Sequence, residues 1–427
     1  MRFLLSALIL LLVICHIFSL DLSLAPGLSA KNAVLYIAAS LIAFRLVVTR
    51  NFQMDMGTFV AVYVAFIAYA IATWLVAGLF IEYKSYSLLQ SGISLKSNLV
   101  DPLIFFLTFY FGARSSEDAV KILKVILIGG VLMHLATLGD AFHIYSLGNY
   151  EEPETNGRMG GPLGEANTYG DFIAMFLPPL CASVVMSRGL ARLWWALSIA
   201  LSMAALLTTA SRAAFVAVLL SSAIGAYVLR RYLPAEKILP WVAKAAAGGL
   251  ILISVIFAVS NDFKQLLYER LIGESQAVGV ANISSGRTEF WSEMLERMML
   301  HPLSLFTGFG WDTYGTMGFL YQSHNYYLSL WFNLGLPGLI LGITPFIILL
   351  GTARRAIGTA DAAYQAYLIA FVFTIYATLI AVFFGELFTP WPYFWAYAGL
   401  LMRLATDAGR TSAPAPSTTP AAKALTA

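Results

Sequence analysis

Charged residues are scarce in this chain, and cysteines are scarcer still. Of its 427 residues only 11% are Asp, Glu, Lys or Arg, whereas 59% are hydrophobic. Because ordinary soluble domains carry about 25% charged residues, this chain cannot cover itself with a polar surface and must have lipid as its solvent. Its two cysteines, Cys15 and Cys181, lie in apolar runs and indicate neither a disulfide framework nor a metal site. The net charge of +3 leaves the partners open.

Several catalytic and binding signatures are also missing. The sequence contains no Walker loop, no dinucleotide-binding fingerprint and no Ser-His-Asp arrangement. Its expected outer segments hold no Asp-x-Asp pair for a divalent ion. We therefore expect no metal, no cofactor and no nucleic-acid partner. The lack of an internal repeat at a fixed period argues against the repeat architectures common among transporters.

Long apolar segments are what the sequence has in abundance. A helix needs roughly 20 apolar residues to cross a bilayer, and a backbone in lipid must satisfy its own hydrogen bonds. We therefore predict an all-α integral membrane protein with about twelve transmembrane helices. The expected spans are 3–20, 30–49, 57–81, 99–113, 119–140, 169–187, 190–209, 212–230, 241–259, 325–350, 362–384 and 390–405.

Basic residues set the expected orientation. With the N-terminus in the cytoplasm, the inner loops hold Arg45, Arg188, Arg230 and Arg354, and the outer face receives the acidic run at 151–154. Both termini are then cytoplasmic. The first apolar segment is expected to stay as a span, because no A-x-A-like cleavage site follows it.

This orientation divides the chain into four parts. We expect nine transmembrane helices with short loops in 1–260, and a long outer loop with an interfacial helix in 261–324. Three further transmembrane helices follow in 325–405. The tail 406–427 is rich in Ala, Pro, Ser and Thr and is expected to be disordered in the cytoplasm. The polar segment 83–98 is expected to be an outer interfacial helix.

Four outer loops carry polar groups to one face of the membrane. The first, a glycine-rich loop, contains Arg158 and Asn167, with Glu165 between them; both charged side chains could equally be solvated. The second has Ser211 as an expected helix cap and Arg212 at the helix start. An arginine there opposes the helix dipole, and a bound anion would relieve that mismatch; the alternative is an arginine that reaches lipid phosphate.

The other two loops flank the last group of spans. Arg287 begins a run to Leu300 with amphipathic helical spacing, so it stands either at a helix start or on a solvated face. His324 and Asn325 enter the span at 325–350. A histidine at this boundary is either a polar cap or a general base, since its ordinary pKa of about 6.5 suits proton transfer near neutrality.

In their order, these motifs resemble the O-antigen ligase and polysaccharide polymerase superfamily of bacterial envelope glycosyltransferases. The resemblance covers roughly residues 157–345. The motifs that carry it are Gly164-Glu165-Ala166-Asn167, Ser211-Arg212-Ala213, Ser285-Gly286-Arg287, His301-Pro302-Leu303, Gly308-Phe309-Gly310, Ser323-His324-Asn325 and Leu334-Gly335-Leu336-Pro337-Gly338.

The resemblance implies a GT-C-like membrane enzyme that uses a lipid-linked donor without a metal. Its substrate would be a glycan on undecaprenyl diphosphate, presented at the periplasmic face of the bacterial inner membrane. By resemblance, Arg212 and Arg287 would hold the diphosphate, and His324 would orient or deprotonate the acceptor. Glu386 would be the acidic partner of His324. Further substrate contacts are expected from Arg158, Asn167 and Asn325.

The acceptor distinguishes two forms of this enzyme. A polymerase would use another lipid-linked glycan, and a ligase would use the lipid A core. We favour the polymerase, because the outer loops show no feature built to hold a large lipid A core. A chain-length regulator is a candidate partner. A secondary transporter is the alternative from another class, and would depend on mid-span residues such as His134 and Asp140. A non-catalytic scaffold would tolerate changes at Arg212, Arg287 and His324.

Overall fold

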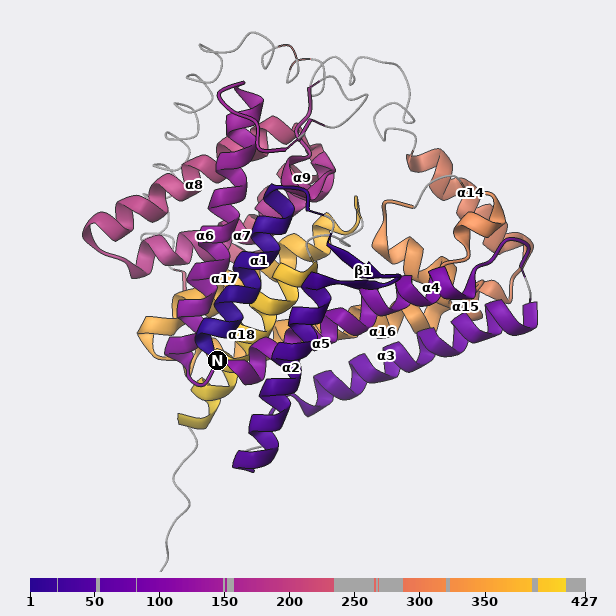
Figure 1. The fold of residues 1–427 in the computed structure, drawn as a ribbon, viewed down its shortest axis with the longest axis horizontal. Helices are drawn as coiled ribbons and strands as arrows, with labels where there is room; N and C mark the ends of the chain where they lie inside the picture. The colour runs from indigo at the N-terminus through magenta and orange to yellow at the C-terminus, as the bar shows by residue number, and fades with distance from the viewer. Residues whose placement is uncertain are drawn as a thin grey trace, which may run out of the picture.

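The fold is an all-α membrane bundle, as predicted (Figure 1). The computed structural model describes residues 1–20, 22–50, 54–81, 83–148, 150–151, 157–233, 265, 268, 287–319, 323–385 and 391–411. Within them the named strands are one short antiparallel hairpin of β1 (Ser23–Ala25) and β2 (Leu28–Ser29).

The α-helices follow in chain order. They are α1 (Arg2–Ile17), α2 (Ala30–Thr49), α3 (Gly57–Val76), α4 (Leu88–Leu95), α5 (Asp101–Gly112), α6 (Ser116–Ala141), α7 (Ala166–Met186), α8 (Gly189–Thr209), α9 (Arg212–Val228), α14 (Arg287–Leu300), α15 (Ser304–Thr307), α16 (Tyr326–Ile357), α17 (Ala362–Ala381) and α18 (Trp391–Thr411). Single π-helical turns, η1 (Ala77–Ile81) and η2 (Lys96–Val100), extend α3 and join α4 to α5; η3 (Gly161–Leu163) and η5 (Tyr314–Met317) are 3-10 turns.

Eight helical segments in the described part of the chain are long and apolar enough to cross a membrane. Two shorter apolar helices, α1 and α9, match the expected spans 3–20 and 212–230. The expected span 241–259 lies outside the described residues. The last expected span, 390–405, corresponds to the first part of α18 (Trp391–Thr411), which is not among the eight.

The span that contains α5 begins earlier than expected. Residues 88–112 form one helical segment, in which η2 joins α4 to α5. The prediction of an interfacial helix at 83–98 separate from a short span at 99–113 is therefore wrong. Pairing explains how the polar residues are tolerated, since Lys96 Nζ lies 2.9 Å from Asp101 Oδ2 and a paired charge costs far less in an apolar setting than an isolated one.

This ion pair also fixes the β1–β2 hairpin. Lys96 donates a second hydrogen bond of 2.8 Å to the carbonyl oxygen of Gly27, in the turn of the hairpin. Asp101 accepts further hydrogen bonds from Tyr36 (2.6 Å) and Asn32 (3.1 Å) on α2. One buried carboxylate thus ties together α2, the hairpin and the start of α5.

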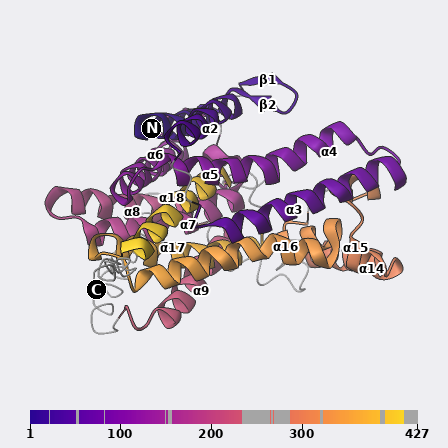
Figure 2. The same cartoon turned by 90° about the horizontal axis from the view of Figure 1, so that it is seen from below.

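Helix α18 is the centre of the bundle. Most of its apolar side chains are completely buried, and it packs against α5, α6, α16 and α17. Figure 2 shows a second group beside this centre, in which α3 runs between α4 and α16.

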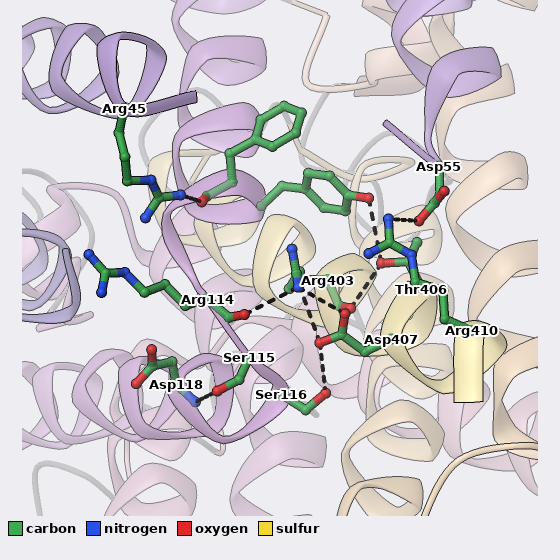
Figure 3. Close-up of polar contacts among 12 residues, drawn as sticks. Arg45, Asp55, Arg114, Ser115, Ser116, Asp118, Arg403, Thr406, Asp407 and Arg410 are labelled. Carbon is green, nitrogen blue, oxygen red and sulfur yellow. Dashed lines mark hydrogen bonds and ion pairs between the residues drawn. The ribbon is translucent and has the colours of Figure 1, made fainter. Parts of the chain in front are cut away.

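We call the end of the bundle where α5 ends and α6 begins the far end. Polar contacts there connect parts of the chain that are distant in sequence (Figure 3). Arg403 on α18 forms a 3.0 Å ion pair with Asp407 and donates to the carbonyl of Arg114 at 3.2 Å. Ser116, in the first turn of α6, donates to Asp407 at 3.1 Å, and Arg45 on α2 donates to the carbonyl of Phe111 at 2.6 Å. These contacts hold α2, α5, α6 and α18 in register.

Helix α16 is broken at Gly335, which has φ 65° and ψ −169°. The break leaves backbone carbonyls without helical partners, and the N–H groups of a neighbouring loop bind these carbonyls instead. Phe309 N donates to Phe332 O at 2.9 Å, and Gly310 N donates to Asn333 O at 2.8 Å. Tyr69 donates to the carbonyl of Leu334 at 3.0 Å. The two glycine motifs of the resemblance therefore dock on each other.

Replacement of Gly335 by alanine should destabilise the protein. A Cβ there would lie 2.1 Å from the carbonyl oxygen of Phe306, and the positive φ costs any L residue about 1–3 kcal/mol. Thermal unfolding in detergent should show a lower Tm for Gly335→Ala. Gly351→Ala, in the same helix, is the matched control, since its Cβ meets only Arg355 Nη1 at 3.7 Å; equal Tm values for the two variants would contradict the prediction.

Candidate functional site

The four polar loops singled out in the sequence supply helix starts at the other end of the bundle. We call this the site end: α6 and α8 finish there, and α7 and α9 begin there. Helix α16 begins next to the end of α17, because Tyr326 N donates to Val382 O at 2.9 Å.

A buried hydrogen-bond network joins the first two loops. Arg158 is 5% exposed, and its Nε donates to Thr209 O at 3.0 Å while its Nη2 donates to Asn167 Oδ1 at 3.0 Å. Ser211 donates to the same Asn167 oxygen at 3.0 Å and caps α9 by accepting from Ala214 N. Arg158 and Asn167, expected as substrate contacts, thus fix the position of the α8–α9 turn.

The two arginines expected to bind anions are each the first residue of a helix. Arg212 begins α9 and Arg287 begins α14, and both are partly buried. The positive charge of Arg287 acts on both Asp171 and His324. The N–H groups at a helix start lack helical partners and therefore favour negative ligands. At both positions an anion would be stabilised by these N–H groups and by the arginine charge.

His324 faces a carboxylate that the sequence analysis had not paired with it. Its Nδ1 lies 4.0 Å from Glu165 Oε1, and both side chains are partly exposed. Glu165 is itself oriented by a 2.6 Å hydrogen bond from Thr168. Glu386, the partner expected from the resemblance, lies outside the described residues, so Glu165 is the acidic neighbour of His324 in the described part of the chain.

The surroundings of His324 favour its neutral form. Burial is the largest cause and lowers its pKa; Glu165 acts in the opposite direction, and the positive charge of Arg287 lowers the pKa further. His324 also has a positive φ of 47°, unusual for a residue with a side chain. A neutral imidazole can accept a proton, which is what a general base requires.

Asn325 caps helix α16. Its side-chain oxygen accepts from Leu328 N at 3.1 Å, and its backbone N–H donates to Ser323 Oγ at 3.1 Å. Asn325 is 5% exposed. This cap accounts for Asn325, which was expected as a substrate contact, without a substrate.

The helix predicted to begin at Arg287 is present as α14, and its apolar side faces the protein. Met294 and Met298 are buried in a cluster that also contains Phe332 of α16. Trp291 Nε1 donates to the carbonyl of Ser323 at 2.7 Å. The Trp291 ring packs against the ring of Phe383, with 5.6 Å between the ring centroids. Helix α14 is thereby held next to His324.

Asp171, a carboxylate one turn beyond Asn167 in α7, was not among the residues expected from the sequence. It is 1% exposed, and neither of its oxygens has a hydrogen-bond partner in the described part of the structure. A Cβ at Gly385 would lie 2.9 Å from Asp171 Oδ2, so the carboxylate faces the segment after α17. The available signal was an acidic residue inside an apolar run, which in a membrane protein indicates function by default.

Comparison with protein families identifies the segment that holds most of this site. Residues 197–343 match the Wzy_C family model, described as O-antigen ligase. The match contains Arg212, Arg287 and His324, and it confirms the resemblance found in the sequence. The comparison with curated proteins gives no match.

Together with the apolar helices, the family match indicates a multi-pass membrane protein with a glycosyl-transferring role in surface polysaccharide biosynthesis. Lipid-linked glycans and their acceptors are the general partners of such a protein. Within the described residues, no three His, Cys, Asp or Glu side chains converge in a group able to hold a metal ion.

The two hydrogen bonds of the buried Arg158 guanidinium should make the stability of the protein sensitive even to a substitution that keeps the positive charge. A lysine has one terminal nitrogen and cannot reach both Thr209 O and Asn167 Oδ1, so Arg158→Lys should cost about 1–3 kcal/mol of stability. Thermal unfolding in detergent measures this cost. Arg192→Lys is the control, because the 2.9 Å bond from Arg192 to Ser187 O is exposed; an equally small effect at both sites would contradict the assignment.

Proposed function

We propose, from the match of residues 197–343 to the O-antigen ligase family model, that this chain is a glycosyltransferase of the bacterial inner membrane, active at the periplasmic face. It transfers a glycan from undecaprenyl diphosphate to an acceptor hydroxyl during surface polysaccharide biosynthesis. The observation that carries the proposal is electrostatic: Arg287, at a helix start, acts on the same His324 that faces Glu165.

In the proposed reaction, the oxygen of the acceptor hydroxyl attacks the anomeric carbon of the donor glycan. A glycosidic bond forms, the bond from that carbon to the phosphate oxygen breaks, and undecaprenyl diphosphate leaves with the bonding electrons. Negative charge therefore grows on the diphosphate. Arg212 and Arg287 stabilise it, since a guanidinium is permanently charged and can form paired hydrogen bonds with phosphate oxygens, and the α9 and α14 helix starts add their N–H groups.

The hydroxyl proton passes to His324 in this scheme. Burial and Arg287 keep the imidazole neutral and ready to accept the proton. Once His324 is protonated, the nearby Glu165 carboxylate stabilises the imidazolium, as an acidic neighbour does for other catalytic histidines. Glu386 remains the other acidic candidate for this role. Metal ions have no part in the scheme, because the two arginines supply the positive charge.

A polymerase and a ligase differ only in the acceptor. We propose the polymerase on the sequence argument about the outer loops, with a chain-length regulator as an open partner. The ligase is the second candidate, because the matched family is described as O-antigen ligase; its acceptor would be the lipid A core.

Turnover by the purified protein tests the proposal. Protein in nanodiscs is given an undecaprenyl-diphosphate-linked oligosaccharide, with or without lipid A core, and the products are followed by mass. A ladder of repeat-unit additions is expected for the polymerase, and EDTA should not change it. Transfer only in the presence of the core would establish the ligase. No product with either acceptor, together with normal surface polysaccharide in a deletion strain, would overturn the proposal.

Arg287 should be essential for turnover. Arg287→Ala removes both charge and hydrogen bonds from the leaving diphosphate, and a loss on the order of a thousandfold in kcat/KM is expected. Arg287→Lys keeps the charge without the paired geometry and should still lose about tenfold or more. Arg297→Ala, in the same helix but against the ring of Phe319, is the control. Full activity of the lysine variant would show that only charge matters at this position.

His324 should determine the acid side of the pH–rate profile. As a base it works when neutral, and its lowered pKa means that kcat/KM should fall only below the ordinary histidine value of about 6.5. His324→Ala should lose on the order of a hundredfold or more and should lose this acid limb. His301→Ala, at an exposed turn, should keep both rate and limb. If His324→Ala retained the wild-type acid limb, another group would be the base.

A further inference from the structure

The segment that connects α14 to the loop at Phe309 exposes four large apolar side chains, which we call the apolar patch. Met299 and Leu300 end α14, Leu303 precedes α15, and Phe306 lies within α15. Their side chains are 69%, 69%, 72% and 62% exposed. The last three recur at every third residue through consecutive helical turns, a spacing that brings side chains to one face. An exposed apolar surface of this kind marks a site of interaction.

Charged residues stop where the apolar patch begins. Helix α14 is charged on its exposed side, where Glu293 and Glu296 lie, but residues 298–311 contain no Asp, Glu, Lys or Arg. The polar His301 packs its ring against Phe309, with 6.0 Å between the ring centroids. Since charged side chains are excluded from hydrocarbon, this boundary is typical of a segment that passes from water into lipid.

The backbone of this segment forms hydrogen bonds within the segment itself. His301 N donates to Met298 O at 3.1 Å, and Ser304 N donates to His301 O at 2.8 Å. Thr307 donates to Leu303 O twice, from its backbone N–H at 3.0 Å and from its hydroxyl at 3.2 Å. Because hydrocarbon offers no hydrogen-bond partners, internal bonding of this kind is what a segment needs in order to enter it.

The apolar patch lies beside an exposed apolar surface of α16. A Cβ on Gly335 would meet the carbonyl oxygen of Phe306 at 2.1 Å, so α15 touches the helix at its break. Leu336 follows directly and Ile340 comes one turn later, and both are exposed on a helical segment long and apolar enough to cross a membrane. Figures 1 and 2 show α14 and α15 at the outer edge of the group formed by α3, α4 and α16.

We propose that the apolar patch is a membrane anchor, which inserts into the hydrocarbon of the leaflet next to α15. Lipid is the occupant because the patch is uncharged, bonded within its own backbone and continuous with the exposed side of α16. The anchor is therefore the segment after α14, whereas the apolar side of α14 itself faces the protein through Met294 and Met298.

This anchor holds the second end of α14. The first part of the helix is already fixed next to His324, since Trp291 donates to the carbonyl of Ser323 at 2.7 Å. Insertion of Leu303 and its neighbours into lipid would fix the other end. The orientation of α14 relative to the membrane would then be set by one protein contact and one lipid contact. The inference does not depend on the proposed transfer reaction.

Fluorophores placed in the patch measure its depth in the membrane. Leu303→Cys and Phe306→Cys are labelled in a protein that also carries Cys15→Ala and Cys181→Ala, in phosphatidylethanolamine–phosphatidylglycerol nanodiscs. Nitroxide-labelled phosphatidylcholine with its nitroxide at two acyl depths should quench both labels and place them about 5–10 Å below the headgroup–acyl boundary. Aqueous iodide should quench neither. Glu293→Cys, on the exposed side of α14, is the control and should show the reverse pattern.

A charge in the patch gives a second measurement without a label. Leu303→Asp would carry a carboxylate into hydrocarbon, which is costly, so its Tm in nanodiscs should fall. Ser292→Asp, at an exposed position of α14, is the matched control and should keep the wild-type Tm. A Tm for Leu303→Asp equal to that of the wild type would contradict insertion.

Two patterns of quenching would overturn the proposal. Quenching of the labels at 303 and 306 by iodide would show that the patch lies in water. Quenching by neither iodide nor the lipid nitroxides would show that protein covers the patch, either a second copy or another segment of this chain. Since no donor or acceptor is present in these measurements, both outcomes would leave the proposed function intact.

Discussion

The opened backbone of α16 at Gly335 is the constraint on which the site depends. Carbonyl groups released from a helix must find donors, and here they come from the loop at Phe309 and Gly310. The same hydrogen bonds therefore repair the helix and dock the polar loop that follows α14. The first part of α16 is then free to take its own direction, and its start places His324 opposite Glu165.

Polar contacts at the two ends of the bundle have different characters. At the far end, Arg403, Asp407 and Ser116 bond to one another and hold the helix ends together, while Arg45 Nη1 is buried there without a hydrogen-bond partner among the described residues. At the site end, Arg158 and Asn167 close the network between the loops, whereas Asp171 has no hydrogen-bond partner among the residues that the structure describes. Groups held in place surround groups whose charge can change, which is how a site is kept rigid around reacting atoms.

The sequence predicted the features that depend on local pattern. The apolar spans, the cap at Ser211 and the helices beginning at Arg212 and Arg287 follow from composition and spacing within a few residues. The pairing of His324 with Glu165 could not be predicted, because these residues are far apart in the chain and meet only through packing. The error over 88–112 has the same origin: Lys96 is tolerated within the helix through its contact with Asp101, whose other partners lie on α2.

The central position of α18 has a consequence for biogenesis. Helices enter the membrane in the order of their synthesis, and α18 is the last described helix of the chain, yet it fills the space between α5, α6 and α16. The earlier helices must therefore remain separated at their core until translation is almost complete, since contacts distant in sequence form late. A ribosome halted before residue 391 would leave a nascent chain with an open interior, a ready substrate for membrane quality control.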